Sequence, residues 1–421
     1  MIDAMPAMQY RNRAAKAVAI GLMLAALTTG CAQTSAARGP SASPGPTSRL
    51  SPAQATEAFG LSLMRRLPAG NLVFSPDSVA AALAMTGTGA AGQTATQIAR
   101  ALQLSSPASF AAVGSLQGAI AAEQSTLAQG SSEAPTLNIA NGLFVQQGFA
   151  LQAPFTTGLA QSFGTSPQIV DFTSPSAPEA INTWIAKQTH GLIPRVVGKL
   201  LPTTRLALAN AIYLKAAWSD KFKTRDTALE PFHGQDATTS TPFMHEAESF
   251  PYARGREYAA LSLPYRNSTL SLVVVLPVGE SLGKFEQHLD ARALERIVHS
   301  LRRRSVRVSL PRFHLKTTAT LNAPLQQLGI VDAFAEGKAD FSRITQAVPL
   351  RISEVLHAAD FKVDERGTEA AAATVVTVEA LSEGIFPHAV SFNADRPFMF
   401  FLRDDRSGAL LFAGRLVKPQ D

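Results

Sequence analysis

The sequence predicts a large folded part in which helices and strands are mixed, and a few stretches carry that prediction. Residues 180–193 place apolar side chains at helical spacing before a terminal Gly-Leu-Ile, which predicts an amphipathic helix ended by glycine. Residues 206–218 are almost entirely apolar, which is typical of a strand in the centre of a sheet. Residues 268–277 and 305–313 are predicted to be further strands. Hydrophobic residues make up 46% of the 421 residues, which permits a large core.

The N-terminus has the pattern of an export signal. Three basic residues between positions 11 and 16 precede an apolar run, residues 17–27, that is too short for a comfortable transmembrane helix. The Leu-Thr-Thr-Gly-Cys that ends at Cys31 resembles the lipobox of bacterial lipoproteins, although Leu27 stands four residues before the cysteine rather than three. We therefore expect residues 1–30 to be a lipoprotein-type signal peptide and Cys31 to be acylated, with plain secretion as the alternative.

The segment after the signal is predicted to be a tether. Cys31 is the only cysteine in the chain, which excludes an intramolecular disulfide and fits lipidation better than redox or metal chemistry. Residues 31–50 are small, polar and rich in Pro and Ser, so they cannot form a core. Ser51 followed by Pro52 has the pattern of a helix N-cap and first turn. The folded domain is therefore predicted to span residues 51–421.

The net charge is modest for a chain of this length. The formal charge is +6, and residues 1–30 contribute +2 of it through three basic residues and one acidic residue. The remaining +4 predicts no nucleic-acid partner. A basic cluster occurs at Arg302, Arg303, Arg304 and Arg307. We interpret that cluster as a solvated surface run rather than a polyanion site.

Motifs of the common enzyme classes are missing or out of context. There is no Gly-x-Ser-x-Gly elbow, no His-Glu-x-x-His and no cysteine pair, and the eight histidines are not at metal-ligand spacing. Residues 87–92 formally match the dinucleotide-binding fingerprint, but they follow a helical pattern, and no acidic residue occurs over positions 110–115. A loop between two helices is the prediction there. A Ser-His-Asp catalytic triad assembled from distant residues would leave no such motif, and nothing in the sequence points to one.

Residues 364–382 combine an acidic turn with a run of small and β-branched side chains. At a period of two, Glu369 and Glu379 fall on one face, whereas the other face, from Thr368 to Val378, is wholly uncharged. This alternation predicts a strand with one buried side. An ordinary strand or an Ala-rich loop remains the alternative from these residues alone.

Several motifs together resemble the serpin family. The Glu-Arg-Gly-Thr-Glu-Ala-Ala-Ala-Ala-Thr that starts at Glu365 is similar to the serpin hinge, and the segments 392–398 and 411–415 are similar to those that follow the reactive loop and close the fold. Residues 71–78 and 210–218 match the family patterns Asn-x-x-x-Ser-Pro-x-Ser and Asn-Ala-x-Tyr-x-Lys-x-x-Trp. The resemblance covers nearly the whole mature chain. It implies an α+β serpin fold with a large central mixed β-sheet, two smaller sheets, about nine helices and an exposed reactive loop.

The resemblance also implies roles for individual residues. The implied hinge consists of Glu365, Gly367, Thr368, Glu369, Ala370, Ala371, Ala372 and Ala373. The residues implied at the sheet opening are Ser75, Ser78, Asn210, Trp218, Arg312 and His357. Among these, His357 is expected to bond Asn210, and Arg312 is expected to pair with Glu365. The usual family spacing from Glu365 puts the reactive bond between Leu381 and Ser382.

The implied activity is suicide inhibition of an endopeptidase. A protease would attack the Leu381 carbonyl and form an acyl-enzyme, and the freed loop would then insert into the main sheet and trap the protease. A leucine before the bond suits a chymotrypsin-like, subtilisin-like or papain-like protease.

The partners expected on this basis are the target protease and, through the lipid anchor, a membrane at the cell envelope or surface. We expect a monomer with no cofactor, no metal and no nucleic acid. Two other function classes remain open. One is a non-inhibitory serpin that acts as a binding or carrier protein, and the other is a surface adhesion or structural lipoprotein that merely keeps the fold.

Overall fold

The computed structural model describes residues 50–129, 135–368 and 389–419, all of which belong to one compact unit. None of the helices within these ranges is long and apolar enough to cross a membrane. The described α-helices are α1 (Pro52–Met64), α2 (Pro76–Thr88), α3 (Gly92–Ala101), α4 (Phe110–Ala128), α5 (Ala153–Phe163), α6 (Ala177–Gln188), α7 (Leu282–His288), α8 (Ala291–Ser300) and α9 (Asn322–Gln327). Short 3₁₀ turns are η1 (Pro107–Ser109), η2 (Thr224–Asp226) and η3 (Asp332–Phe334).

A six-stranded mixed sheet carries the predicted hinge. Its strands, in spatial order, are β10 (Phe313–Thr320), β11 (Glu354–Asp364), β12 (Gly367–Thr368), β4 (Leu206–Ala217), β2 (Thr136–Gln146) and β3 (Gln168–Val170). The two-residue β12 lies between β11 and β4 and is antiparallel to both. Beyond β12 the strands β11 and β4 pair directly and in parallel, from Glu354 opposite Ala207 to Ala359 opposite Ile212.

A second sheet contains the other nine described strands. Its main path is β1 (Leu72–Phe74), β15 (Leu410–Leu416), β14 (Phe398–Asp404), β8 (Leu270–Pro277), β7 (Tyr258–Pro264), β6 (Thr238–Arg254), β9 (Arg302–Pro311) and β13 (Val390–Asn393), and β5 (Ala228–His233) pairs with β6. The α+β class expected from the resemblance is confirmed. The strands expected in two smaller sheets are hydrogen-bonded into one continuous path here, because the 17-residue β6 pairs with both β7 and β9.

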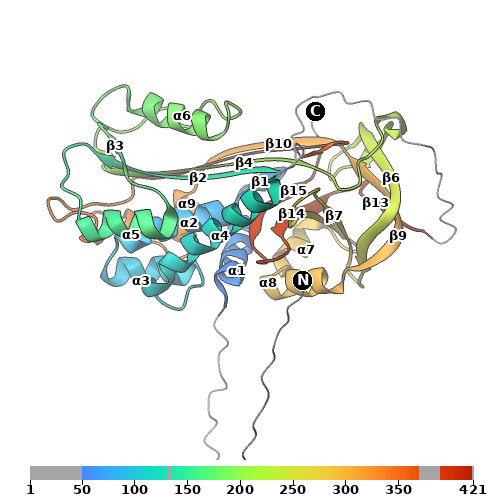
Figure 1. The fold of residues 1–421 in the computed structure, drawn as a ribbon, viewed down its shortest axis with the longest axis horizontal. Coiled ribbons are helices and arrows are strands. Elements are labelled where there is room, and N and C mark those ends of the chain that lie inside the picture. Colours follow the sequence, from blue (N-terminus) through green and yellow to red (C-terminus); the bar gives the residue numbers. More distant parts are fainter. Residues whose placement is uncertain (1–49, 130–134, 369–388, 420–421) are drawn as a thin grey trace, which may run out of the picture. The chain divides into compact units, whose positions relative to one another are not determined.

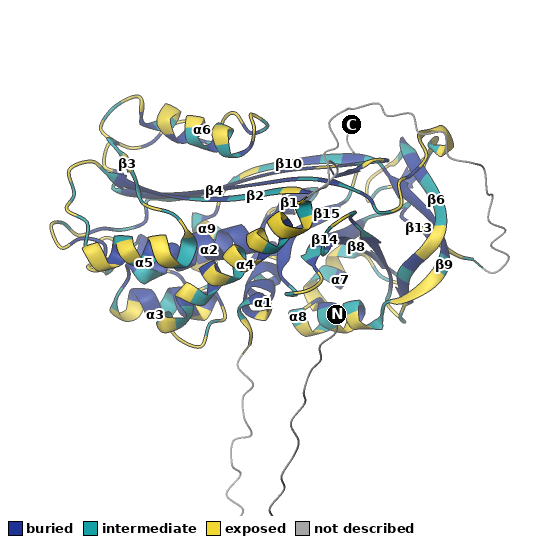
Figure 2. Ribbon diagram, viewed as in Figure 1, coloured by how far each residue is buried: buried dark blue, intermediate teal, exposed yellow. Residues whose placement is uncertain are grey.

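The six-stranded sheet lies between two helical layers. Figure 1 shows α6 on one face of the sheet and α2, α4 and α5 on the other. In α2, twelve of the thirteen residues are buried, from Pro76 to Gly87, which is typical of a helix at the centre of a domain. Figure 2 shows that the strands above α2 are also mostly buried. The region beneath the sheet is therefore closed to water.

The predicted elements are present, with shifts at their ends. The helix expected over residues 180–193 is α6, which ends five residues earlier; Gly191 lies in the turn that follows and has a φ of 85°. The stretch 305–313 divides between β9 and β10, with Arg312 between them. Residues 87–92 span the end of α2 and the start of α3, so the prediction of a connection between helices is confirmed.

Candidate functional site

The start of the predicted hinge already lies inside the six-stranded sheet. Thr368 is the partner of Val363 in β11 and of Ala216 in β4. Gly367 precedes it with a φ of 154°, and a Cβ at this position would lie 1.9 Å from the carbonyl oxygen of Ala216. Only glycine permits this close approach of two backbones, so the sequence at position 367 is required for the chain to enter between the strands.

The side chain of Thr368 is buried and partnered. Its exposed fraction is 1%, and its hydroxyl forms a hydrogen bond with the hydroxyl of Tyr265. Tyr265 stacks on Trp218 with ring centroids 4.5 Å apart, and burial raises the pKa of the Tyr265 phenol above its ordinary value. Tyr265 therefore stays neutral and can keep this bond. Sequence reasoning missed Tyr265, because no local pattern links it to a residue 103 positions away.

Trp218 holds the turn that leads into β12. Its backbone N–H donates to the carbonyl of Arg366 over 2.9 Å, and its indole Nε1–H donates to the carbonyl of Asp364 over 2.9 Å. The tryptophan thus satisfies two backbone acceptors of the turn while its ring covers Tyr265. Trp218 thus lies directly against the turn that leads into β12.

Glu365 is the residue between Asp364 and Arg366 in the chain, and it is 5% exposed. Its Oε1 accepts hydrogen bonds from Arg312, including one from Nε over 2.7 Å, and from the Thr227 hydroxyl over 2.5 Å. Burial alone would raise the pKa of Glu365, but the bonds from Arg312 and Thr227 outweigh it and hold the pKa below its usual range. The expected pair of Arg312 and Glu365 is present, and Thr227 is a third member that the sequence did not indicate.

A second polar cluster joins β11 and β4 to the start of α2 beneath them. His357 Nε2 accepts from the backbone N–H of Ser75 over 3.1 Å, and Nδ1 bonds Oδ1 of Asn210. Asn210 Nδ2 donates to the carbonyl of Ser78 over 3.4 Å, and the hydroxyls of Ser75 and Ser78 bond each other over 2.8 Å. All four side chains are at most 1% exposed.

The partners of His357 fix its proton. A backbone N–H can only donate, so Nε2 carries the lone pair and Nδ1 carries the hydrogen that Asn210 accepts. Burial lowers the pKa of His357 to about 3, so the ring is neutral at physiological pH. His357 and Asn210 are also register partners, and their bond crosses the boundary at which β11 and β4 would part.

The sequence profile of the family described as "Serpin (serine protease inhibitor)" matches residues 54–419. This chain belongs to the serpin family. Among similar proteins, the leukocyte elastase inhibitor of Sus scrofa is 37% identical over 87% of this chain and 98% of its own. An uncharacterized serpin-like protein of Thermococcus kodakarensis is 35% identical over 87% of this chain and 85% of its own.

Solved serpin structures agree with this assignment. The native state of the thermophilic serpin tengpin superposes with a TM-score of 0.76 at 26% identity, over 87% of this chain and 93% of tengpin. Thyroxine-binding globulin in complex with thyroxine superposes with a TM-score of 0.75 at 26% identity, over 88% of this chain and 99% of that one. This serpin therefore shares its overall fold with tengpin and thyroxine-binding globulin.

Part of the predicted site lies outside the described residues. This applies to the hinge residues Glu369 and Ala370 to Ala373, to the reactive bond between Leu381 and Ser382, and to Cys31. Within the described ranges, no group of three or more His, Cys, Asp or Glu side chains could hold a metal ion.

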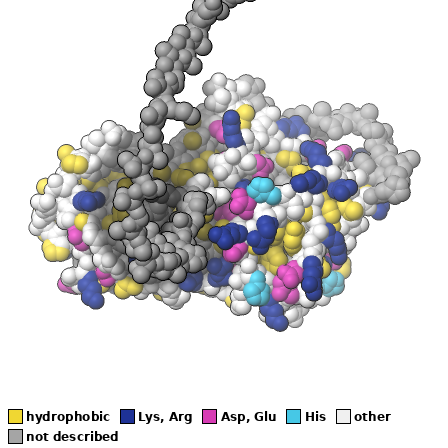
Figure 3. Space-filling model, turned by 90° about the horizontal axis from the view of Figure 1, so that it is seen from below, with side chains coloured by type: hydrophobic (Ala, Val, Ile, Leu, Met, Phe, Trp, Pro, Cys, Tyr) yellow, Lys and Arg dark blue, Asp and Glu magenta, His cyan; other side chains and the backbone are white. Residues whose placement is uncertain are grey.

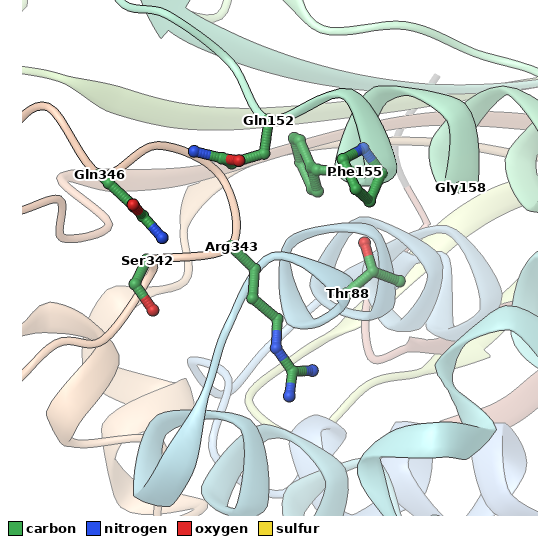
Figure 4. A pocket seen from close by; sticks show the side chains of 8 residues that line it. Thr88, Gln152, Phe155, Gly158, Ser342, Arg343 and Gln346 are labelled. Atoms are coloured by element: carbon green, nitrogen blue, oxygen red, sulfur yellow. The ribbon is translucent and has the colours of Figure 1, made fainter.

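A cavity of about 280 Å³ lies elsewhere in this serpin, between α5, the end of α2 and residues 342–346 (Figure 4). It is lined by Thr88, Gln152, Pro154, Phe155, Gly158, Ser342, Arg343 and Gln346. None of the predicted site residues is among them. The cavity is thus separate from the hinge and from the cluster beneath it.

The arginine cluster at the start of β9 is exposed. Arg302 donates to the carbonyl of His299 over 2.7 Å and Arg303 to that of Ser249 over 2.6 Å, and within the described residues none of the four arginines is in an ion pair. Figure 3 shows one face of the molecule, on which Lys and Arg side chains are interspersed with Asp, Glu and His. These contacts fit the interpretation of a solvated surface run.

Proposed function

We propose that this serpin is a suicide inhibitor of an endopeptidase, a serine protease of chymotrypsin-like or subtilisin-like specificity. The observation that carries the proposal is β12, because the chain has already begun to enter between β11 and β4 and is antiparallel to both strands. A cleaved loop would continue along the same path. The protease, held as an acyl-enzyme at Leu381, would be carried along with the loop.

The register supports continued insertion. Extending the pairs of Thr368 would place Thr374 opposite both Asn210 and His357, which are already partners of each other. The same extension would place Val378 opposite Leu206, the first residue of β4. The uncharged face of residues 368–378 therefore matches the remaining length of the strand beside it.

The energetics favour insertion of such a strand. Roughly a dozen new ladder hydrogen bonds at about 1 kcal/mol net each would supply on the order of 10 kcal/mol. Burial of Val376 and Val378 would add a few kcal/mol more. A gain of this size is comparable to the whole stability of a domain, about 5–15 kcal/mol, so it is of the magnitude needed to distort a protease active site before water completes the acyl step.

The relatives support an inhibitory role in general terms. Several are leukocyte elastase inhibitors by name, including that of Homo sapiens at 34% identity over 85% of this chain. The hinge residues 370–373 are alanines, and no charged or bulky side chain there opposes insertion. We also propose that acylated Cys31 and the tether at residues 31–50 hold the inhibitor at the cell envelope or surface.

The second candidate is a non-inhibitory binding or structural serpin. Thyroxine-binding globulin, which has the same fold, has been solved in complex with thyroxine. A heat-melt before and after nicking of the loop distinguishes the two candidates, because only a loop that inserts raises the melting temperature strongly.

The direct test is incubation with a panel of serine proteases, followed by a denaturing gel. We expect a covalent complex with at least one Leu-selective protease and a C-terminal fragment that begins at Ser382. A protease whose catalytic serine is replaced by alanine is the control, because it cannot form the acyl bond. The absence of a complex with every active protease, together with an unchanged melt after nicking, would favour the second candidate.

A further inference from the structure

Asp77 is a buried acid at the point where α2 meets the sheet. It lies between Ser75 and Ser78 in the first turn of α2, and its exposed fraction is 0%. Its Oδ2 accepts a hydrogen bond from Nε2 of Gln117 in α4 over 2.6 Å. Its Oδ1 is buried and has no hydrogen-bond partner among the described residues. An under-satisfied carboxylate in such a place requires an explanation.

The bond from Gln117 continues to the sheet. Gln117 Oε1 accepts from Nδ2 of Asn141 in β2 over 3.1 Å, and Asn141 Oδ1 is also buried without a partner in the described structure. Asn141 is the register partner of Asn210, which is the register partner of His357. Asn141, Asn210 and His357 thus form a row of polar side chains that crosses β2, β4 and β11. Asp77 of α2 reaches the β2 end of this row through Gln117 of α4, and the α2 N-cap Ser75 bonds the β11 end.

Within the described residues, no positively charged side chain compensates the carboxylate of Asp77. The titratable groups on the elements that pack against α2 and on β11 are Glu57 of α1, Arg100 of α3, Glu123 of α4, Tyr213 and Lys215 of β4, Arg415 of β15 and Glu354, His357, Asp360, Lys362 and Asp364 of β11. Glu57, Glu123 and Arg415 have ion-pair partners elsewhere. Burial raises the pKa of Asp77 to about 6, and the Gln117 bond offsets only part of that effect. At neutral pH the closed sheet therefore holds a charged carboxylate that water would stabilise better.

We propose that Asp77 is a positioning residue that destabilises the closed sheet and promotes the separation of β4 from β11. The bond that crosses this boundary joins His357 to Asn210, and these two residues are held to α2 by Ser75 and Ser78, the neighbours of Asp77. Opening admits water to the same turn and relieves the buried charge. The consequence for inhibition, faster loop insertion, rests on the function proposed above.

The effect depends on pH in a defined direction. Ionised Asp77 favours the open sheet, so its influence is absent below the ordinary aspartate pKa of 3.8, grows as the pH rises from there to about 6, and is complete above that. His357 acts in the opposite sense, because it is neutral when buried and gains a proton more readily when exposed. A comparison of the wild type with an Asp77 variant at each pH cancels the contribution of His357.

The experiment measures hydrogen exchange in peptides from β4 and β11, corrected for the intrinsic rate, for the wild type and Asp77→Asn between about pH 3.5 and 8. We expect the ratio of the wild-type to the variant opening constant to be near one at about pH 3.5, to rise several-fold up to about pH 6 and to level off above it. A shift from 3.8 to about 6 sets a ceiling of about a hundredfold on that ratio. Asp77→Leu, which also lacks the charge, is the second variant in case the asparagine forms new bonds.

Glu57→Gln is the matched control. Glu57 is also a buried acid with a raised pKa, of about 7, but it pairs with Arg403 and lies on α1 rather than under the sheet opening. We expect no pH-dependent ratio for this variant. A flat ratio for both Asp77 variants, or an equal effect of Glu57→Gln, overturns the inference. The exchange measurement needs no protease, so a failure of covalent complex formation would count against the proposed function and not against this role of Asp77.

Discussion

Arg312 and Glu365 connect the junction of β9 and β10 to the first turn of the hinge. The carboxylate of Glu365 is almost fully buried, and Arg312 donates to it from Nε over 2.7 Å and also from Nη2. Loss of one partner of such a pair leaves a buried charge uncompensated, which costs more than the pair itself contributes. The top of the six-stranded sheet is therefore closed by a contact that tolerates little change.

Glu365→Lys places two cations at this contact. We expect the top of the sheet to open early and the protein to form polymers on mild warming, because an open sheet accepts a strand from another molecule. Size-exclusion chromatography after graded heating measures this. Glu336→Lys is the control, because Glu336 is exposed and forms no ion pair within the described residues. A Glu365 variant that stays monomeric and fully inhibitory would show that the pair does not hold the sheet closed.

Thr368→Arg should convert the inhibitor into a substrate. The position is buried beside Tyr265, and an unpaired charge there costs several kcal/mol. The arginine would drive position 368 out of its place between β11 and β4, from which insertion continues, so the acyl-enzyme would have time to hydrolyse. The ratio of covalent complex to cleaved product measures the change. Glu369→Arg, which the alternation of the sequence places on the opposite face, should do far less; equal effects of the two substitutions would contradict that alternation.

Thr374→Val tests the register of insertion. The extended pairing puts Thr374 between Asn210 and His357, whose mutual bond an inserted strand must replace. A valine of similar shape lacks the hydroxyl and would leave His357 Nδ1 and Asn210 Oδ1 without a partner, at about 1–3 kcal/mol. We expect a lower fraction of covalent complex and a smaller rise of the melting temperature after loop cleavage. Thr377→Val is the control on the opposite face, and the same loss in both variants would point to a different register.

His357 makes the native state sensitive to acid. The pKa of its imidazole is ordinarily 6.5 and burial lowers it to about 3 in the folded protein, so below pH 6.5 the unfolded chain binds a proton that the native state does not. Protonation of His357 does not affect the free energy of unfolding above pH 6.5. Below it, the free energy of unfolding falls by about 1.4 kcal/mol per pH unit down to about pH 3, a total loss of about 5 kcal/mol. Urea unfolding of the wild type and His357→Gln at several pH values measures it. A difference in unfolding free energy that does not change with pH would exclude His357 as the titrating group.

Cys31→Ser tests the lipid anchor. If Cys31 is acylated, the variant should leave the membrane fraction and appear in the soluble fraction, because the remaining chain has no acyl group to partition into lipid. Fractionation and immunoblotting of cells that express the two forms measure this. Unchanged membrane retention of the variant would contradict the lipid anchor and would mean that another part of the protein binds the membrane.

The central strand and the segment that resembles a serpin hinge could be predicted from the chain alone. Residues 206–218 are almost entirely apolar, which suits the middle of a sheet, whereas the need for glycine at position 367 became visible only with the approach of the Ala216 carbonyl. The serpin motifs at positions 71–78 and 210–218 are local strings of residues, so they identified Ser75, Ser78 and Asn210 without coordinates. Such features depend on spacing along the chain, and spacing is visible in a sequence.

The distant residues that complete these contacts could be found only from the packed fold. Tyr265, Thr227 and Gln117 meet Thr368, Glu365 and Asp77 across separations of 103, 138 and 40 residues. The burial of Asp77 could also not be foreseen from the sequence. An aspartate in the first turn of a helix is favoured by the helix dipole and is ordinarily exposed to solvent, whereas here the packing of neighbouring elements buries it. Hydrogen bonding and desolvation act through space, and their strength depends on which elements the fold brings together. The sequence therefore identified the hinge, whereas the packed structure determined the side chains and charges that keep the sheet closed.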